Sequence, residues 1–208
     1  MYWSAVCVRG VVTMKQKLLY WEIGSFFFIG LVGAALHFTF ELSNFSSMVV
    51  AYFSAVNEST WEHLKMVFFP GAFFALVEYT YVRDVVKNYL VAKTASIIIM
   101  PLVITLGWYA YTPFTGRSIY KIDLLLFYIA VLVGQIVSYK ILTAPQMSAW
   151  VNRVAQVTLV VLFVAFSTFT FFPPKIFLFE HFDLKDTGLY GILDNYDGLR
   201  YFTKPPTK

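Results

Sequence analysis

The chain has 208 residues with a formal net charge of +4, and 59% of them are hydrophobic while only 13% are charged, against about 25% charged residues in an average soluble domain. A soluble fold of this length has too little interior to hide so much apolar surface, so the composition predicts a polytopic helical membrane protein. The cations flank apolar runs instead of forming a basic patch, so no nucleic-acid partner is expected. The single cysteine, Cys7, excludes an intrachain disulfide and a cysteine-based metal cluster.

The first eighteen residues are predicted to form an N-terminal cytoplasmic extension. Residues 1–13 are mildly apolar, include Arg9 and lack a small-residue cleavage site, which argues against a signal peptide. We expect them to be an upstream extension before a natural start at Met14.

Five apolar segments approach the roughly 20 residues that are needed to cross a hydrocarbon core, and each predicts a transmembrane helix. A shorter run, Met48–Val56, is too short to span and predicts an interfacial helix. The fold class is therefore all-α, with a five-helix bundle over residues 19–172 and a tail over residues 173–208. The predicted spans are Leu19–Phe40, Thr60–Val82, Tyr89–Tyr111, Ile122–Leu142 and Val151–Phe172.

The flanking charges predict how the bundle is oriented. Lys and Arg gather at the N-terminus and in the connections after the second and fourth spans, whereas the connection after the first span carries Glu41 and Glu58. The positive-inside rule then predicts a cytoplasmic N-terminus and an extracytoplasmic tail, in what we expect to be a prokaryotic plasma membrane. In this orientation His37, His63 and His181 all lie on the outer side.

The run NESTWEHLK, residues 57–65, brings several ionisable groups to the start of the second span. Ser59 and Glu62 fit a capping box, in which the serine caps the helix and the glutamate reaches back. The cap does not explain His63, because a cation is disfavoured at a helix N-terminus. Lys65 is expected to snorkel outward or to pair with Glu62.

Histidines and carboxylates on one side of a membrane support two chemistries. One is a site for a divalent metal such as zinc, bound by His37, His63 and either Glu58 or Glu62, with an open water position for hydrolysis or acyl transfer on a lipid-like substrate. The other is metal-free, with His63 as a general base that a carboxylate orients. The candidate catalytic residues are Asn57, Glu58, Glu62 and His63, the candidate metal ligands are His37, His63 and Glu62, and the second-rank residues are Asp123, His181 and Lys65.

Two further interpretations stay open at this point. The same residues are compatible with a non-enzymatic component that binds or transports an ion or docks a partner. Alternatively, the run only locks a tight helical corner, which is expected if Asn57 and Glu62 bind backbone amides. The sequence has no H-E-x-x-H, G-x-S-x-G or nucleotide-binding glycine motif that would decide between them.

The run AVNESTWEHLKMVFFP (Ala55–Pro70), with LHFTFELS upstream (Leu36–Ser43) and FFPP and TGLYGI downstream (Phe171–Pro174 and Thr187–Ile192), resembles an uncharacterised family of small prokaryotic membrane proteins, domain of unknown function 6512 (DUF6512). The resemblance covers roughly residues 15–192. It implies that His37, residues 57–63, Lys65 and the TGLYGI turn belong to one recurring pattern, and it implies no activity. There is also a loose similarity to intramembrane metal hydrolases of the alkaline-ceramidase type, whose His-x-x-x-His pattern is missing here.

Overall fold

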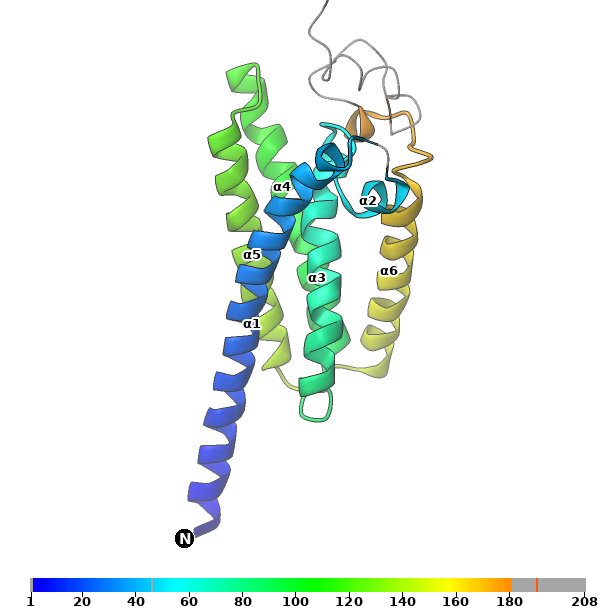
Figure 1. Ribbon diagram of the computed structural model, residues 1–208. Helices are drawn as coiled ribbons and strands as arrows, with labels where there is room; N and C mark the ends of the chain where they lie inside the picture. The colour runs from blue at the N-terminus through cyan, green and yellow to red at the C-terminus, as the bar shows by residue number, and fades with distance from the viewer. Residues whose placement is uncertain (1, 46, 181–189, 191–208) are drawn as a thin grey trace, which may run out of the picture.

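The computed structural model describes residues 2–45, 47–180 and 190, with side chains from Met14 onward (Figure 1). Five long helices and one short helix account for most of this part of the chain, which confirms the all-α prediction. No strand occurs in the described residues, where Glu180 and Tyr190 form a single isolated antiparallel bridge. The elements are α1 (Tyr2–Leu42), α2 (Met48–Phe53), α3 (Thr60–Val82), α4 (Tyr89–Thr115), α5 (Tyr120–Leu142), α6 (Ala149–Thr168) and a 3-10 turn, η1 (Phe177–Phe179).

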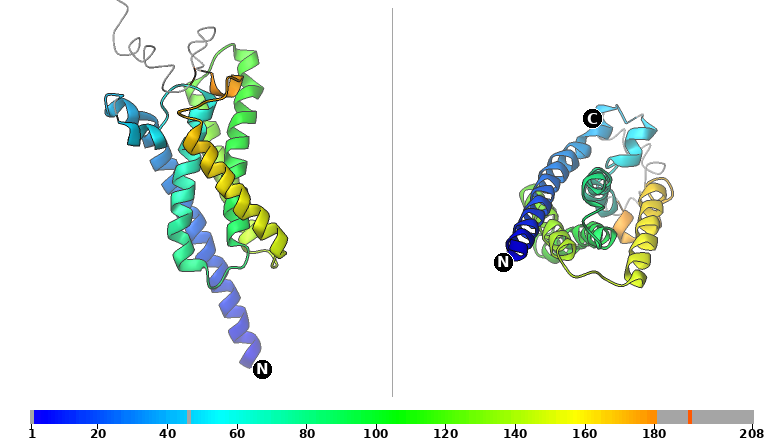
Figure 2. Two further views of the ribbon diagram at one scale, coloured as in Figure 1. Left: turned by 90° about the vertical axis from the view of Figure 1, so that its right-hand side faces the viewer. Right: turned by 90° about the horizontal axis from the view of Figure 1, so that it is seen from below.

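The long helices alternate in direction and form a single bundle. Seen along the bundle, α1 and α5 lie on one side and α6 on the other, with α3 and α4 between them (Figure 2). The short helix α2 lies at the end where α1 finishes and α3 begins (Figure 1). We call this end of the bundle the His63 end and the opposite end the Glu78 end. A helix is found at each predicted span, and α3 has the predicted bounds, whereas α6 ends at Thr168 and not at Phe172.

Four of the helices are long and apolar enough to cross a membrane, which supports a membrane localisation. Their apolar stretches are Met14–Leu42, Tyr89–Thr115, Tyr120–Leu142 and Ala149–Thr168. Helix α3 has the length of a span, 23 residues, but Glu62, Lys65 and Glu78 make it less apolar. Its charged side chains are buried against the neighbouring helices, and its exposed side chains include Phe73 and Leu76, so the outer surface of α3 is still apolar.

Helix α1 begins earlier than predicted, at Tyr2 and not at Leu19. The sequence prediction stopped at Lys17 because a lysine does not belong in a hydrocarbon core, but a helix continues through lysine without difficulty. The structure therefore adds a helical N-terminal stretch to the predicted span.

Helix α1 crosses α3 and α5 closely at one point and then leaves them. A Cβ atom at Gly33 would lie 2.3 Å from the backbone oxygen of Met66 on α3, and one at Gly30 would lie 2.8 Å from the ring of Tyr128 on α5. A backbone oxygen cannot move aside, so glycine is required at Gly33, whereas at Gly30 a Cβ atom would make the Tyr128 ring shift. Beyond the crossing, α1 and α5 diverge toward the His63 end (Figures 1 and 2), and the candidate site lies in the space between them.

Candidate metal centre

A network of hydrogen bonds fixes the corner that leads into α3. The Ser59 hydroxyl caps the helix by accepting the Glu62 N–H at 3.3 Å, as the capping box predicts, but the Glu62 carboxylate reaches back to the Val56 N–H and not to the Ser59 N–H. The Asn57 side-chain oxygen accepts the Ser59 N–H at 2.8 Å. The corner is therefore rigid, and it sets the direction in which His63 leaves the first turn.

Glu62 and Lys65 form a buried ion pair beneath this corner. Their charged atoms lie 2.6 Å apart, and the side chains are 2% and 0% exposed. Lys65 also donates to the Ala51 carbonyl at 2.8 Å and to the Thr170 hydroxyl at 3.0 Å, which in turn donates to Glu62 at 2.9 Å. The second Glu62 oxygen binds the Val56 N–H at 3.2 Å as well. The pair thus connects α2, α3 and the segment after α6. Of the two alternatives predicted for Lys65, the structure shows the pairing with Glu62 and not the outward orientation.

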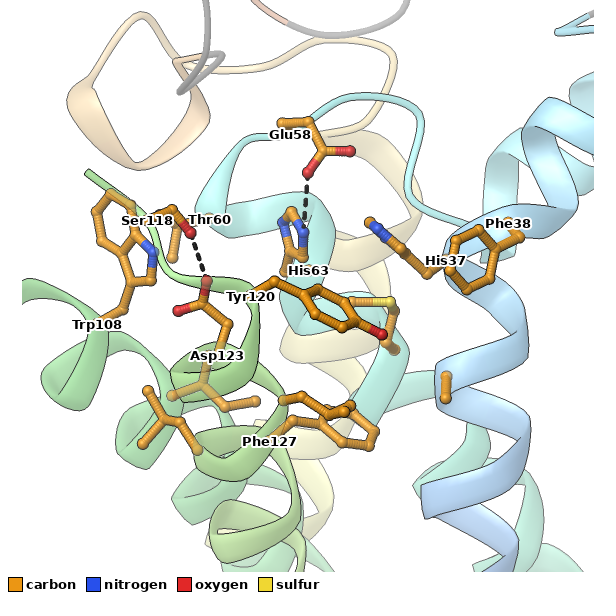
Figure 3. Close-up of a pocket in the computed structure, with 15 residues that line it drawn as sticks. His37, Phe38, Glu58, Thr60, His63, Trp108, Ser118, Tyr120, Asp123 and Phe127 are labelled. Carbon is orange, nitrogen blue, oxygen red and sulfur yellow. Dashed lines mark hydrogen bonds and ion pairs between the residues drawn. The ribbon is translucent and has the colours of Figure 1, made fainter. Parts of the chain in front are cut away.

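Three other predicted residues meet on the open side of the corner. His37 comes from α1, Glu58 from the loop before α3, and His63 from the first turn of α3 (Figure 3). Each offers a ligand atom, and these three atoms all lie within 4.8 Å of one another. The two imidazole rings have centroids 5.2 Å apart. Two nitrogens bound to one zinc ion are at most about 4.2 Å apart, since each Zn–N bond is about 2.0–2.1 Å, so small side-chain rotations suffice to close the site.

Hydrogen bonding fixes which nitrogen of His63 carries the proton. Its Nδ1 lies 2.8 Å from the Ser59 carbonyl oxygen, and a carbonyl only accepts, so Nδ1 is the donor. Nε2 then faces the Glu58 carboxylate at 3.3 Å. A ring held through Nδ1–H by a backbone carbonyl, with Nε2 directed at a shared site, is the usual arrangement of a metal-binding histidine. His37 adds a buried Nδ1 with no hydrogen-bond partner among the described residues.

The three residues line a cavity of about 380 Å³ between α1, α3, α4 and α5. Its polar wall also contains Thr60, Ser118 and Asp123, and its apolar wall includes Phe38 and Phe127 (Figure 3). The volume is within the usual range for a small-molecule site, which combines apolar walls with a few polar groups.

Asp123, predicted as a second-rank residue, lies on the cavity wall in the first turn of α5, close to Ser118 (Figure 3). Its carboxylate accepts hydrogen bonds from the hydroxyls of Tyr111 and Ser118. Tyr111 and Ser118 were not predicted from the sequence. Trp108 and Tyr120, which line the cavity together with Ser118, were not predicted either. The only available signal was the position of Ser118 and Tyr120 immediately before Asp123.

The predicted site residues therefore separate into two groups. His37, Glu58 and His63 come together around one point, with Asp123 on the wall of the same cavity. Glu62, Lys65 and Asn57 belong to the hydrogen-bonded corner, and it is Glu58, not Glu62, that faces the histidines. His181 lies outside the described residues, as does most of the TGLYGI turn.

The fold and the cluster define a class of protein: an all-helical chain of membrane type, with a His/Glu cluster at one end of its bundle. The chain belongs to the family of unknown function DUF6512, whose model matches residues 9–192. No curated protein and no solved structure matches the chain. The family assignment confirms the resemblance drawn from the NESTWEHLK run, and the function has to be argued from the site.

Proposed function

We propose that His37, Glu58 and His63 bind a divalent metal ion such as zinc, and that the protein hydrolyses an ester or amide bond of a lipid-like substrate at this centre. The observation that carries the proposal is the approach of three ligand atoms to within 4.8 Å at the edge of a cavity. Two histidines and one carboxylate, with an open position, form the ligand set of a known class of zinc hydrolases.

The metal-free alternative receives less support from the same contacts. A histidine that acts as a general base needs one ring nitrogen directed at the substrate or its water. In His63, Nδ1 is bound to the Ser59 carbonyl and Nε2 faces Glu58. Glu58 therefore occupies the position in which the substrate or its water would have to lie to give its proton to His63. A metal ion between Glu58 and the two histidines would instead be bound by all three side chains.

The roles of the side chains follow from their positions. A bound divalent ion lowers the pKa of its water to about 7 and polarises a carbonyl. In the hydrolysis, a water in the cavity would lose a proton as its oxygen bonds to the carbonyl carbon, the bond to the leaving alcohol or amine would break, and the leaving group would take up that proton. We assign the transfer of that proton to Asp123, because it is the remaining carboxylate of the cavity wall. Ser118 and Tyr111 orient it through their hydrogen bonds.

The walls of the cavity support a lipid as substrate. The cavity is lined by Ala34 and Phe38 on α1 and by Leu124 and Phe127 on α5. These two helices diverge above their crossing (Figure 1), and both are apolar enough to contact acyl chains. A lipid would place its ester or amide at the His/Glu cluster and its chain between α1 and α5. The Lys and Arg distribution supports an outward-facing site, with the N-terminus in the cytoplasm.

Hydrolysis of purified lipids by the purified full-length protein tests the proposal. Ester- and amide-linked lipids would be incubated with protein that has been stripped of metal by chelation and then reloaded with zinc, and the released fatty acid would be measured by mass spectrometry. We expect release only after reloading, and its loss in Glu58→Gln. The exposed acid Asp84, at the opposite end of the bundle, supplies the control Asp84→Asn, which should retain activity. Zinc binding without release from any lipid would instead favour the non-enzymatic ion-binding function.

A further inference from the structure

A second group of charges is buried near the Glu78 end of the bundle, away from the candidate metal centre. It consists of Glu22 on α1, Glu78 on α3 and Lys93 on α4. The Lys93 ammonium lies 2.6 Å from Glu22 Oε1 and 2.6 Å from Glu78 Oε2. The side chains are 3%, 0% and 7% exposed. Glu78 therefore pairs with Lys93 and not with a cation nearer to it in the chain.

The surroundings of this cluster supply few further hydrogen bonds. Ser138 on α5 donates to Glu22 Oε1 at 2.8 Å, and the Tyr89 hydroxyl lies 3.4 Å from Glu78 Oε2. Among the described residues, no cation other than Lys93 lies within 4.0 Å of either carboxylate. The two outer oxygens, Glu22 Oε2 and Glu78 Oε1, are buried and have no hydrogen-bond partner in the same part of the chain.

The charges of the cluster do not balance when all three groups are ionised. Two carboxylates and one ammonium leave one net negative charge. The cluster is enclosed between helices with apolar residues on both sides, such as Met100 toward the bundle centre and Val82 toward its end. An uncompensated buried charge is costly. The Glu62–Lys65 pair differs in this respect, because one acid and one base cancel.

We propose that the Glu22–Lys93–Glu78 cluster is an intramembrane proton-binding site that holds one exchangeable proton on one of its two carboxyl groups. A proton on either of the two outer oxygens, which have no partner among the described residues, removes the excess charge. A divalent metal ion is not expected to bind here, because the positively charged Lys93 ammonium already lies 2.6 Å from both carboxylates and would repel it. Ionisable groups of this kind within membrane helices form proton relays in pumps and transporters.

The position of the cluster permits exchange with one side of the membrane. Glu78 lies four residues before the end of α3, and Lys93 lies four residues after the start of α4. At 1.5 Å per residue, each is about 6 Å from the end of its helix. The Tyr89 hydroxyl also lies at that end, 3.4 Å from Glu78, but it donates its own proton to the Ala75 carbonyl at 2.6 Å. This proposal is independent of the metal site and of any lipid substrate.

Infrared difference spectroscopy of the full-length protein in lipid discs tests the proposal, because a protonated carboxylic acid has a carbonyl band that a carboxylate lacks. At neutral pH we expect a band for one buried acid, with a small shift in heavy water. The band should be lost in Glu22→Gln and also in Glu78→Gln. In each variant the remaining carboxylate and the Lys93 ammonium form a neutral ion pair, so no proton is needed. The exposed acid Glu41 supplies the control Glu41→Gln, which should leave the band unchanged.

Lys93→Met provides a second test that retains both acids. Without the ammonium, both carboxyl groups should be protonated, so the band should increase about twofold. The proposal is overturned if the unmodified protein lacks the band at neutral pH, or if the band survives in both glutamine variants. It is also overturned if the band emerges only when sodium is removed, since the cluster would then hold a metal cation and not a proton.

Discussion

Substitution of Lys65 by methionine should strongly destabilise the protein, although it changes none of the proposed metal ligands. Methionine keeps the length and apolar character of the side chain but removes the ammonium, which lies 2.6 Å from Glu62. The Glu62 carboxylate, 2% exposed, is then left with the Thr170 hydroxyl and the Val56 N–H as partners. Removing one partner of a buried ion pair costs about 3–5 kcal/mol.

Thermal unfolding in detergent measures this effect. For a chain of this size, a change of 1 kcal/mol shifts Tm by about 2–4 °C, so Lys65→Met should lower Tm by about 6–20 °C. The double variant Glu62→Gln/Lys65→Met should recover most of this loss, because glutamine is neutral and its oxygen can still accept the Val56 N–H. A Lys65→Met protein as stable as the unmodified chain, or a double variant no more stable than Lys65→Met, would refute the reasoning.

Three further predictions follow from the corner, the helix crossing and the candidate ligands. Ser59→Ala removes the N-cap bond to Glu62 and should lower the free energy of unfolding by about 1 kcal/mol, measured by chemical denaturation, while zinc binding is retained. Gly33→Ala places a Cβ atom 2.3 Å from a backbone oxygen and should lower the free energy of unfolding by at least about 1–3 kcal/mol. The control is Gly24→Ala, whose Cβ atom would lie 3.5 Å from its nearest neighbour. It should be neutral or stabilising in the same assay. Zinc affinity should fall as the pH is lowered through the range in which the two imidazoles take up protons, because protonated imidazole cannot bind a metal. An affinity that is constant between about pH 5.5 and 7.5 would contradict histidine ligation.

The sequence predicted the helices well because hydropathy alone decides which segments can cross a lipid core. The bounds of α3 were correct at both ends, since Ser59 caps its start and Arg83 follows its end. Helix α1 was predicted too short, because hydropathy reports where a helix enters lipid and not where the helix begins.

The candidate site was predicted in part. Topology placed His37 and His63 on the same side of the membrane, and the structure brings them together with Glu58. The sequence did not distinguish Glu58 from Glu62, because that choice depends on which carboxylate Lys65 neutralises. Ser118 and Tyr111 were missed for a similar reason: a hydroxyl becomes informative only when its partner, here Asp123, is known.

The buried cluster at the Glu78 end also required the three-dimensional structure. Glu22 and Lys93 are 71 residues apart in the chain, and no local pattern connects them. Lys93, which is distant from Glu22 in the chain, comes within 2.6 Å of Glu22 and Glu78 because α1, α3 and α4 meet at this point.

Zinc binding to the purified full-length protein, followed by X-ray absorption spectroscopy of the bound ion, tests the central claim most directly. The account predicts one zinc ion per chain, bound by two imidazole nitrogens and a carboxylate oxygen at about 2.0–2.2 Å. His37→Ala and His63→Ala should each lose the ion, whereas Glu62→Gln should retain it. Zinc retained in full by either histidine variant, or lost in Glu62→Gln while the protein stays folded, would contradict a centre built from His37, Glu58 and His63.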